Sequence, residues 1–165
     1  MRIFSTLFFF LLCAACSPLT EQPLQQLTRD FYSVYSERKD LDQFLSFYAE
    51  DAVLEDIING DRIEGKEALR VFFDWSNPGF KALAKNTLVV EDIITSQNQA
   101  VVKGYFTPFG WGEETFEAMY FTTILTFNDA DKISKQVDWI NYPASLVDYT
   151  NRKNANDWIQ QDTNE

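Results

Sequence analysis

Histidine is absent from this 165-residue sequence. Its absence excludes Ser-His-Asp and Cys-His catalysis, and it removes the commonest side-chain ligand for zinc and related metals. Acid-base chemistry must therefore use aspartate, glutamate, lysine or tyrosine. We expect neither a bound metal nor a cofactor.

Positive charge is also scarce, with 14 Lys and Arg against 25 Asp and Glu and a formal net charge of −11. Nucleic-acid binding needs clustered Lys and Arg, so we exclude a nucleic-acid partner. Apolar material is plentiful, because 45% of the residues are hydrophobic and 15 are phenylalanine. This composition is enough for the core of one ordinary domain.

Cysteine occurs only twice, as Cys13 and Cys16 at the end of an N-terminal apolar run. Arg2 precedes this run, which is followed by the small residues Ala14 and Ala15. A basic start, an apolar middle and a small-residue site are typical of a secretory signal peptide. The run is too short to span a bilayer, which needs roughly 20 apolar residues.

Ala14-Ala15-Cys16 resembles the lipobox of bacterial lipoproteins, although Cys13 stands where leucine is usual. The resemblance implies a signal peptide over residues 1–15 and a diacylated Cys16, with residues 16–23 as a tether. Two acyl chains are enough for stable anchoring. Ser17, in place of the aspartate that retains lipoproteins at the inner membrane, implies an outer-membrane anchor facing the periplasm. Ordinary secretion with cleavage nearby is the alternative.

Helical periodicity begins after the tether, because apolar residues recur on one face at positions 24, 27, 31, 34 and 35. Asp40 followed by Gln43 is a capping-box pattern, and it predicts a second, shorter helix that buries Leu41, Phe44, Leu45 and Tyr48. Gly65 precedes a third predicted helix over residues 66–75.

Strand patterns occur at residues 52–58, 87–95, 100–107, 115–127 and 132–142. The last four are separated by short turns, which implies antiparallel pairing. We expect an α+β cone domain over residues 24–150, in which a curved antiparallel sheet wraps around three N-terminal helices, and a polar tail over residues 151–165. Its conical interior suits a small apolar ligand.

Two strings resemble the nuclear transport factor 2-like superfamily, in particular its polyketide cyclase (SnoaL-like) and ketosteroid isomerase branches. They are FYAEDAVLEDIINGDRIEGKEALRVFF at residues 47–73 and LTFNDADKISKQVDWINY at residues 125–142. The resemblance implies the cone fold just described. It constrains activity less, since this fold hosts enzymes, binding proteins and scaffolds.

The isomerase resemblance implies catalytic roles for two residues. Asp56 stands where that family places its general base, and Tyr32 stands where it places an oxyanion-hole tyrosine. Each has a structural alternative. Asp56 could bond turn amides near Asn59 and Gly60, and Tyr32 could be a core residue with its hydroxyl at an edge.

Asp138 is the third catalytic candidate, matching an acidic residue of the cyclase-like branch. Strand alternation leaves its direction open, because a one-residue change of register moves it from the cavity to solvent. Thr123 occupies the position at which the isomerases place a protonated acid, and a hydroxyl is a weaker donor. If Asp56 and Asp138 both face inward, at least one pKa should be raised.

Met119, Phe121, Thr123 and Ile140 are the predicted pocket-lining residues, with plain core packing as the alternative. Two functional hypotheses remain. In the first, an envelope lipoprotein binds a small apolar molecule in its cone, with or without proton-transfer chemistry at Asp56. In the second, a non-catalytic module forms a homodimer through the outer face of the sheet and serves an envelope assembly.

Overall fold

The computed structural model describes residues 23–147, 149–151 and 153–158. The predicted signal peptide and the predicted lipidation site Cys16 lie outside the described residues. So does most of the predicted tether, and the polar tail is described only in part. Within the described residues, no helix is long and apolar enough to cross a membrane.

Three α-helices occur where periodicity predicts them: α1 at Pro23–Glu37, α2 at Leu41–Leu45 and α3 at Lys66–Phe73. The predicted cap is present, because the Asp40 carboxylate accepts a hydrogen bond from the backbone N–H of Gln43 at 2.9 Å. The second helix is shorter than expected. Tyr48, which we placed on that helix, instead begins the first strand, and its ring still packs in the core.

The main sheet of the described chain has six strands in the order β2-β1-β9-β8-β5-β4. They are β1 Tyr48–Asp56, β2 Asp61–Glu64, β4 Leu88–Ser96, β5 Gln99–Phe106, β8 Met119–Phe127 and β9 Ile133–Ile140. The α+β cone-like class is confirmed, but the sheet is mixed rather than purely antiparallel. β1 and β9 run parallel, and their register places Asp56 beside Asp138.

A second, three-stranded sheet comprises β3 Phe80–Ala82, β6 Phe109–Trp111 and β7 Glu114–Phe116, in the order β3-β6-β7. The run that we expected as one strand over residues 115–127 is therefore divided between β7 and β8. Beyond β9, the chain forms the 3-10 helices η1 at Ala144–Leu146 and η2 at Ala155–Trp158.

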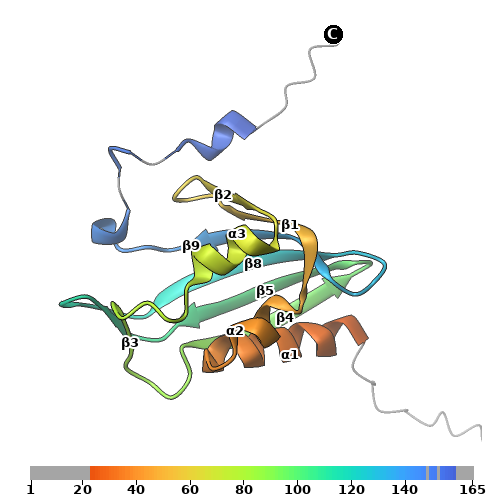
Figure 1. Cartoon of the computed structure of the whole chain (residues 1–165), viewed down its shortest axis with the longest axis horizontal. Helices are drawn as coiled ribbons and strands as arrows, with labels where there is room; N and C mark the ends of the chain where they lie inside the picture. The colour runs from red at the N-terminus through yellow and green to blue at the C-terminus, as the bar shows by residue number, and fades with distance from the viewer. Residues whose placement is uncertain (1–22, 148, 152, 159–165) are drawn as a thin grey trace, which may run out of the picture.

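The helices gather on one side of the main sheet (Figure 1), where α1 contacts β4 and β5 and α3 contacts β1 and β2. Aromatic side chains fill the space between them. Phe31 of α1 stacks on Phe44 of α2 with ring centroids 5.1 Å apart, and the edge of Phe73 from α3 meets Phe44 at 4.7 Å. These ring contacts pack the three helices against one another.

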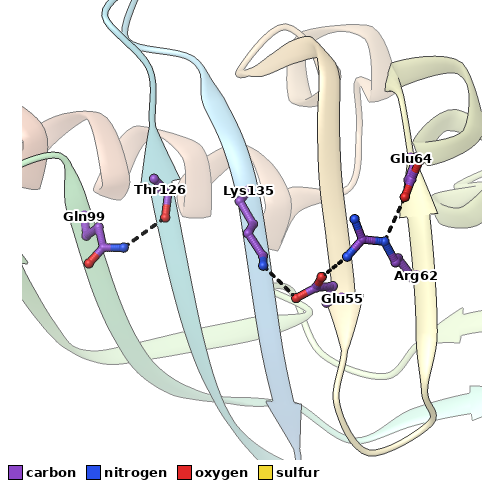
Figure 2. A network of polar contacts seen from close by, with 6 residues as sticks. All are labelled: Glu55, Arg62, Glu64, Gln99, Thr126 and Lys135. Atoms are coloured by element: carbon purple, nitrogen blue, oxygen red, sulfur yellow. Dashed lines mark hydrogen bonds and ion pairs between the residues drawn. The ribbon is translucent and has the colours of Figure 1, made fainter. Parts of the chain in front are cut away.

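The opposite face of the sheet carries polar and charged side chains (Figure 2). Glu55 of β1 is ion-paired with Arg62 of β2 and with Lys135 of β9, the latter at 2.9 Å. Farther along, the Gln99 amide donates a hydrogen bond to Thr126 at 3.1 Å. Alternation along the strands therefore sends Glu55 and Lys135 outward while their neighbours Asp56 and Gln136 point to the helix side.

Candidate functional site

A cavity of about 370 Å³ lies on the helix side of the sheet. Its walls come from the end of α1, the concave faces of β1, β5, β8 and β9, the small sheet, and the segment after β9. The lining is mostly aromatic and aliphatic and includes Tyr35, Leu54, Phe73, Phe106, Phe109, Trp111 and Met119. Its acidic groups are Asp56 and Asp138, and its basic group is Arg38.

The cavity narrows toward the interior into a small hollow lined by Tyr32, Phe121, Thr123 and Gln136. Tyr35, Phe106, Asp138 and Ile140 line both the main cavity and this narrow end. Asp138 therefore stands at the junction of the two spaces. The Asp138 side chain therefore borders the space that a ligand in the main cavity would occupy.

Asp138 faces the cavity, which settles the direction that sequence alternation left open. It is 7% exposed, whereas its neighbour Trp139 is 39% exposed on the outer face. The Asp138 carboxylate accepts hydrogen bonds from the Thr123 hydroxyl at 2.5 Å and from the Gln136 amide at 2.7 Å. Burial raises the pKa of Asp138 to about 6, the two hydrogen bonds oppose that rise, and the charge of Asp56 adds to it.

The donor Gln136 is itself held in place. The Tyr48 hydroxyl donates a hydrogen bond at 2.5 Å to the Gln136 carbonyl oxygen, which leaves the Gln136 N–H to face Asp138. Gln136 is 2% exposed, and both Tyr48 and Gln136 are buried in the core. Tyr48 of β1 thus fixes the orientation of Gln136, which is one of the two donors to the Asp138 carboxylate.

Asp56 is even more buried, at 2% exposure, but its partners are different. One carboxylate oxygen accepts hydrogen bonds from the backbone N–H groups of Ile58 and Asn59 at 2.9 and 3.0 Å. The other oxygen accepts a hydrogen bond from the Tyr142 hydroxyl at 2.6 Å. These contacts agree with the alternative in which Asp56 fastens the turn between β1 and β2.

Tyr32 lies at the narrow end of the cavity, beside Thr123. Its ring stacks on Phe121 with centroids 5.9 Å apart, and its side chain is 4% exposed. Burial, and then the charge of Asp138, raises the pKa of Tyr32 well above its ordinary value, while a hydrogen bond with Thr123 lowers it. Tyr32 is therefore a neutral phenol. It lines the narrow end together with Asp138, whereas Asp56 lines the main cavity.

The predicted lining residues all border these spaces. Met119 and Ile140 line the main cavity, while Phe121, Thr123 and Ile140 line the narrow end. Alternation along β8 was the signal for Met119, Phe121 and Thr123, whereas the register implied by the family resemblance was the signal for Ile140.

Several residues of the site were missed from the sequence. Tyr35 lies one helical turn after Tyr32 and lines both spaces, so the i,i+3 spacing could have identified it. Tyr142 continues the alternation of Asp138 and Ile140, which could have indicated its direction. Arg38 follows the end of α1, where periodicity gives no direction for a side chain.

Across residues 23–147, 149–151 and 153–158, no group of three or more acidic or cysteine side chains is placed to hold a metal ion. The arrangement offers two buried carboxylates, neutral phenols and a mostly apolar wall. It can bind a small apolar molecule, and it can move a proton at Asp138.

Known proteins share this architecture. The profile of the SnoaL-like domain family matches residues 28–136. A search of the curated proteins found no match. Among solved structures, a SnoaL-like protein from Shewanella putrefaciens CN-32 is 20% identical with a TM-score of 0.63, over 74% of this chain and 93% of that one.

Two further structures hold small molecules. A protein with a ketosteroid isomerase-like fold from Catenulispora acidiphila, in complex with trimethylamine, is 12% identical with a TM-score of 0.59, over 74% of this chain and 88% of that one. TerC, co-crystallized with polyporic acid, is 16% identical with a TM-score of 0.56, over 72% and 91%. At these identities the likeness shows the fold alone.

Proposed function

This chain belongs to the SnoaL-like domain family, and we propose that it binds a small apolar molecule in its cone and transfers a proton with Asp138. Proteins of the same fold hold small molecules, namely trimethylamine in one case and polyporic acid in another. The aromatic and aliphatic lining described above favours a ligand that is largely apolar.

One observation carries the proposal: Asp138 is a buried carboxylate in the wall of a mostly apolar cavity, and burial raises its pKa to about 6. A general acid-base group works best when its pKa lies near the operating pH, because both protonation states are then accessible. Perturbed carboxylates in clefts are also typical of functional sites. Asp138 meets both conditions and lines both parts of the cavity.

In the proposed step, the Asp138 carboxylate takes a proton from a carbon beside a carbonyl group. The C–H electron pair moves toward the carbonyl, so negative charge develops on its oxygen. Tyr35 is placed to donate a hydrogen bond to this oxygen, because burial raises its pKa and keeps the phenol neutral. Return of the proton to another carbon completes an isomerisation without loss of atoms.

Asp56 has a supporting role in this proposal. Its two oxygens already accept three hydrogen bonds, including two from rigid backbone amides. Its charge is one of the causes of the raised pKa of Asp138. Tyr32 assists at the narrow end, where its hydroxyl is beside Thr123.

Proton exchange in a simple ketone tests the proposal. The bicyclic ketone 2-tetralone has acidic protons beside its carbonyl group, and their replacement by deuterium in D₂O is followed by NMR. We expect the protein to accelerate exchange, and Asp138→Asn to lower the accelerated rate by about 10²-fold or more. The control is Asp92→Asn, which changes an exposed acid on β4. Exchange that persists in Asp138→Asn, or no acceleration by the unmodified protein, contradicts the proposal.

A second candidate function rests on the outer face of the sheet. Ile94, Val101, Ile124 and Val137 are successive cross-strand neighbours from β4 to β9, so they form one apolar row. Ile94 is 62% exposed. At the other end of the row Val137 is the cross-strand neighbour of Glu55, which belongs to the charged cluster shown in Figure 2. A second copy of this chain would supply both an apolar row and complementary charges, so we propose a homodimer through this face.

Sedimentation tests the homodimer. We expect a dimer at micromolar concentration, and Val101→Glu should weaken it at least tenfold, because a charge would enter the apolar row. Val71→Glu is the matched control, since Val71 is exposed on α3, on the helix side of the sheet. A monomeric unmodified protein would remove this candidate and leave the cavity proposal intact.

We also propose that Cys16 is lipidated and anchors the domain to the outer membrane, facing the periplasm. The support is the sequence Ala14-Ala15-Cys16-Ser17 alone. In a bacterial host fed labelled palmitate, the protein should carry the label and partition into detergent. Cys16→Ser should lose both properties, and a Cys16→Ser protein that keeps the label contradicts the proposed anchor.

A further inference from the structure

Arg38 occupies an unusual backbone position at the rim of the cavity. Helix α1 ends at Glu37, and Arg38 follows it with φ of 48°, in the left-handed region. Its N–H still bonds the Val34 carbonyl at 3.2 Å. Non-glycine residues adopt this conformation at a cost of about 1 kcal/mol, and such residues cluster at binding sites. Here the conformation accompanies a side chain that lines the cavity.

Two aromatic rings hold the guanidinium group of Arg38. Its Cζ atom lies 4.1 Å from the centroid of the Phe80 ring and 5.4 Å from that of Trp75. Phe80 belongs to the small sheet, where it stacks on Phe109, a second residue of the cavity wall. The rings restrict the guanidinium plane, and stacking leaves the N–H groups at its edge free to donate.

Within the described chain, the Arg38 guanidinium makes no ion pair or hydrogen bond with a protein group, in contrast to two other arginines. Arg62 pairs with Glu55 and Glu64, and Arg70 pairs with Asp42 at 2.7 Å. The charge of Asp74 raises the pKa of Arg38 without a direct contact between the two side chains. Burial lowers the pKa of Arg38, as expected for a cation that lacks a carboxylate in contact.

A second donor without a partner lies in the same neighbourhood. Among the described residues, the indole N–H of Trp75 is buried and has no hydrogen-bond acceptor. The Trp75 ring also stacks on that of Tyr35, which lines the cavity. Arg38 lines the cavity and Trp75 does not, so the unused N–H groups of the Arg38 guanidinium are the donors open to an acceptor from outside the chain.

We propose that Arg38 is the anion-binding residue of the cavity, and that the ligand is an apolar, ring-containing molecule with a carboxylate. This inference rests on the proposed function and specifies its ligand class. The carboxylate would accept a bidentate hydrogen bond from the guanidinium fork, and the rings would lie along the aromatic wall. Because Asp138 repels the anionic end, the reacting end of the ligand faces Asp138 and the carboxylate faces Arg38.

Three test ligands of one shape separate the charge from the apolar body: 2-naphthoate, neutral 2-naphthamide and cationic 2-naphthylmethylammonium. Their affinities are measured by isothermal titration calorimetry on the unmodified protein. We expect 2-naphthoate to bind about tenfold or more tighter than 2-naphthamide, because a hydrogen-bonded charge pair replaces a neutral contact. Equal affinities, or tightest binding of the cation, overturn the inference and leave the proposed small-molecule function standing.

Arg38→Asn removes the guanidinium group and keeps the backbone conformation, since asparagine tolerates positive φ. We expect it to weaken 2-naphthoate binding about 10- to 100-fold and to change 2-naphthamide binding less than twofold. Arg38→Lys keeps the charge without the fork, so it should give an intermediate loss. Arg70→Asn is the matched control and should leave the affinities for both ligands unchanged.

The outcomes separate the two ideas. If 2-naphthoate binds equally well to Arg38→Asn and to the unmodified protein, the assignment of Arg38 is wrong, whereas the cavity remains a ligand site. If none of the three ligands binds at millimolar concentration, both the proposed function and this inference fail. The comparison of ligands on the unmodified protein remains decisive even if a variant does not fold.

Discussion

Asp56 and Asp138 are paired residues on neighbouring parallel strands, they face the same cavity, and both are buried. Their partners nevertheless differ in kind. Asp56 is held by two backbone amides of its own turn and by the Tyr142 hydroxyl. The Asp138 carboxylate instead accepts its hydrogen bonds from the side chains of Thr123 and Gln136.

These different partners show how two aspartates on neighbouring strands can have different roles. Backbone amides cannot move without breaking the turn, so Asp56 stays fastened and stabilises the link between β1 and β2. The Thr123 hydroxyl, by contrast, can rotate when the Asp138 carboxylate gains or loses a proton. Asp138 is therefore the acid whose protonation state can change while the fold is kept. Substitutions at each of the two aspartates test this comparison.

The largest effect should follow from removing the fastened acid. Asp56→Ala leaves two backbone N–H groups and the Tyr142 hydroxyl without their acceptor. Since each buried unsatisfied donor costs about 1–3 kcal/mol, we expect a loss of about 4 kcal/mol in the free energy of unfolding. Urea denaturation measures it, with Asp92→Ala as an exposed control that should change by less than about 0.5 kcal/mol. A loss below about 1 kcal/mol would mean that Asp56 does not hold the turn.

The second test concerns the pH dependence of Asp138. Its pKa of about 6 lies above the value of about 3.9 expected in the unfolded chain. Between these values the folded protein keeps a proton that the unfolded chain has released, so the contribution of Asp138 to stability falls as pH rises from about 4 to 7. The difference between the folded and unfolded pKa values corresponds to about 3 kcal/mol in the free energy of unfolding.

Asp138→Asn cannot titrate and provides the comparison. The free energy of unfolding of this variant, relative to that of the unmodified protein, should increase by about 3 kcal/mol from pH 4 to 7, so the variant gains stability by comparison. Asp56→Asn should lower the pKa of Asp138, because the charge of Asp56 contributes to its rise. Parallel stability curves for Asp138→Asn and the unmodified protein would show that Asp138 has an ordinary pKa.

Much of the fold could be predicted from local patterns. Helical periodicity located α1 and α3, and the Asp40 cap located the start of α2. The parallel pairing of β1 with β9 could not be predicted, because it joins residues about 80 positions apart and leaves no local signal. β3, β6 and β7 have three residues each, too few for a period to be recognised.

The site was predictable where a side chain follows strand alternation. Met119, Phe121 and Thr123, which we expected on one face of β8, line the two spaces of the site. The direction of Asp138 was ambiguous, because both faces of β9 carry apolar residues and the register depends on its neighbours. The different partners of Asp56 and Asp138 could not be predicted either, because Tyr142 and Gln136 reach them only through the fold.

A smaller effect is expected at the partner of Asp56. Tyr142→Phe removes a charge-assisted hydrogen bond, but the two backbone amides remain, so the loss should be about 2 kcal/mol in the free energy of unfolding. Denaturation measures it. Tyr120→Phe is the control, because Tyr120 is exposed on the outer face and should change stability by less than about 0.5 kcal/mol. A Tyr142→Phe protein as stable as this control would show that the amides alone hold Asp56.

The smallest effect should come from Tyr48, which contacts Asp138 only through Gln136. Tyr48→Phe keeps the packed ring and removes the hydrogen bond to Gln136, which should cost about 1 kcal/mol. The Gln136 amide can then rotate and turn its oxygen toward Asp138. Because a lost donor disfavours the ionised carboxylate, the pKa of Asp138 should rise further above about 6. Carboxyl NMR titration measures this pKa, and an unchanged value would mean that Gln136 keeps its orientation without Tyr48.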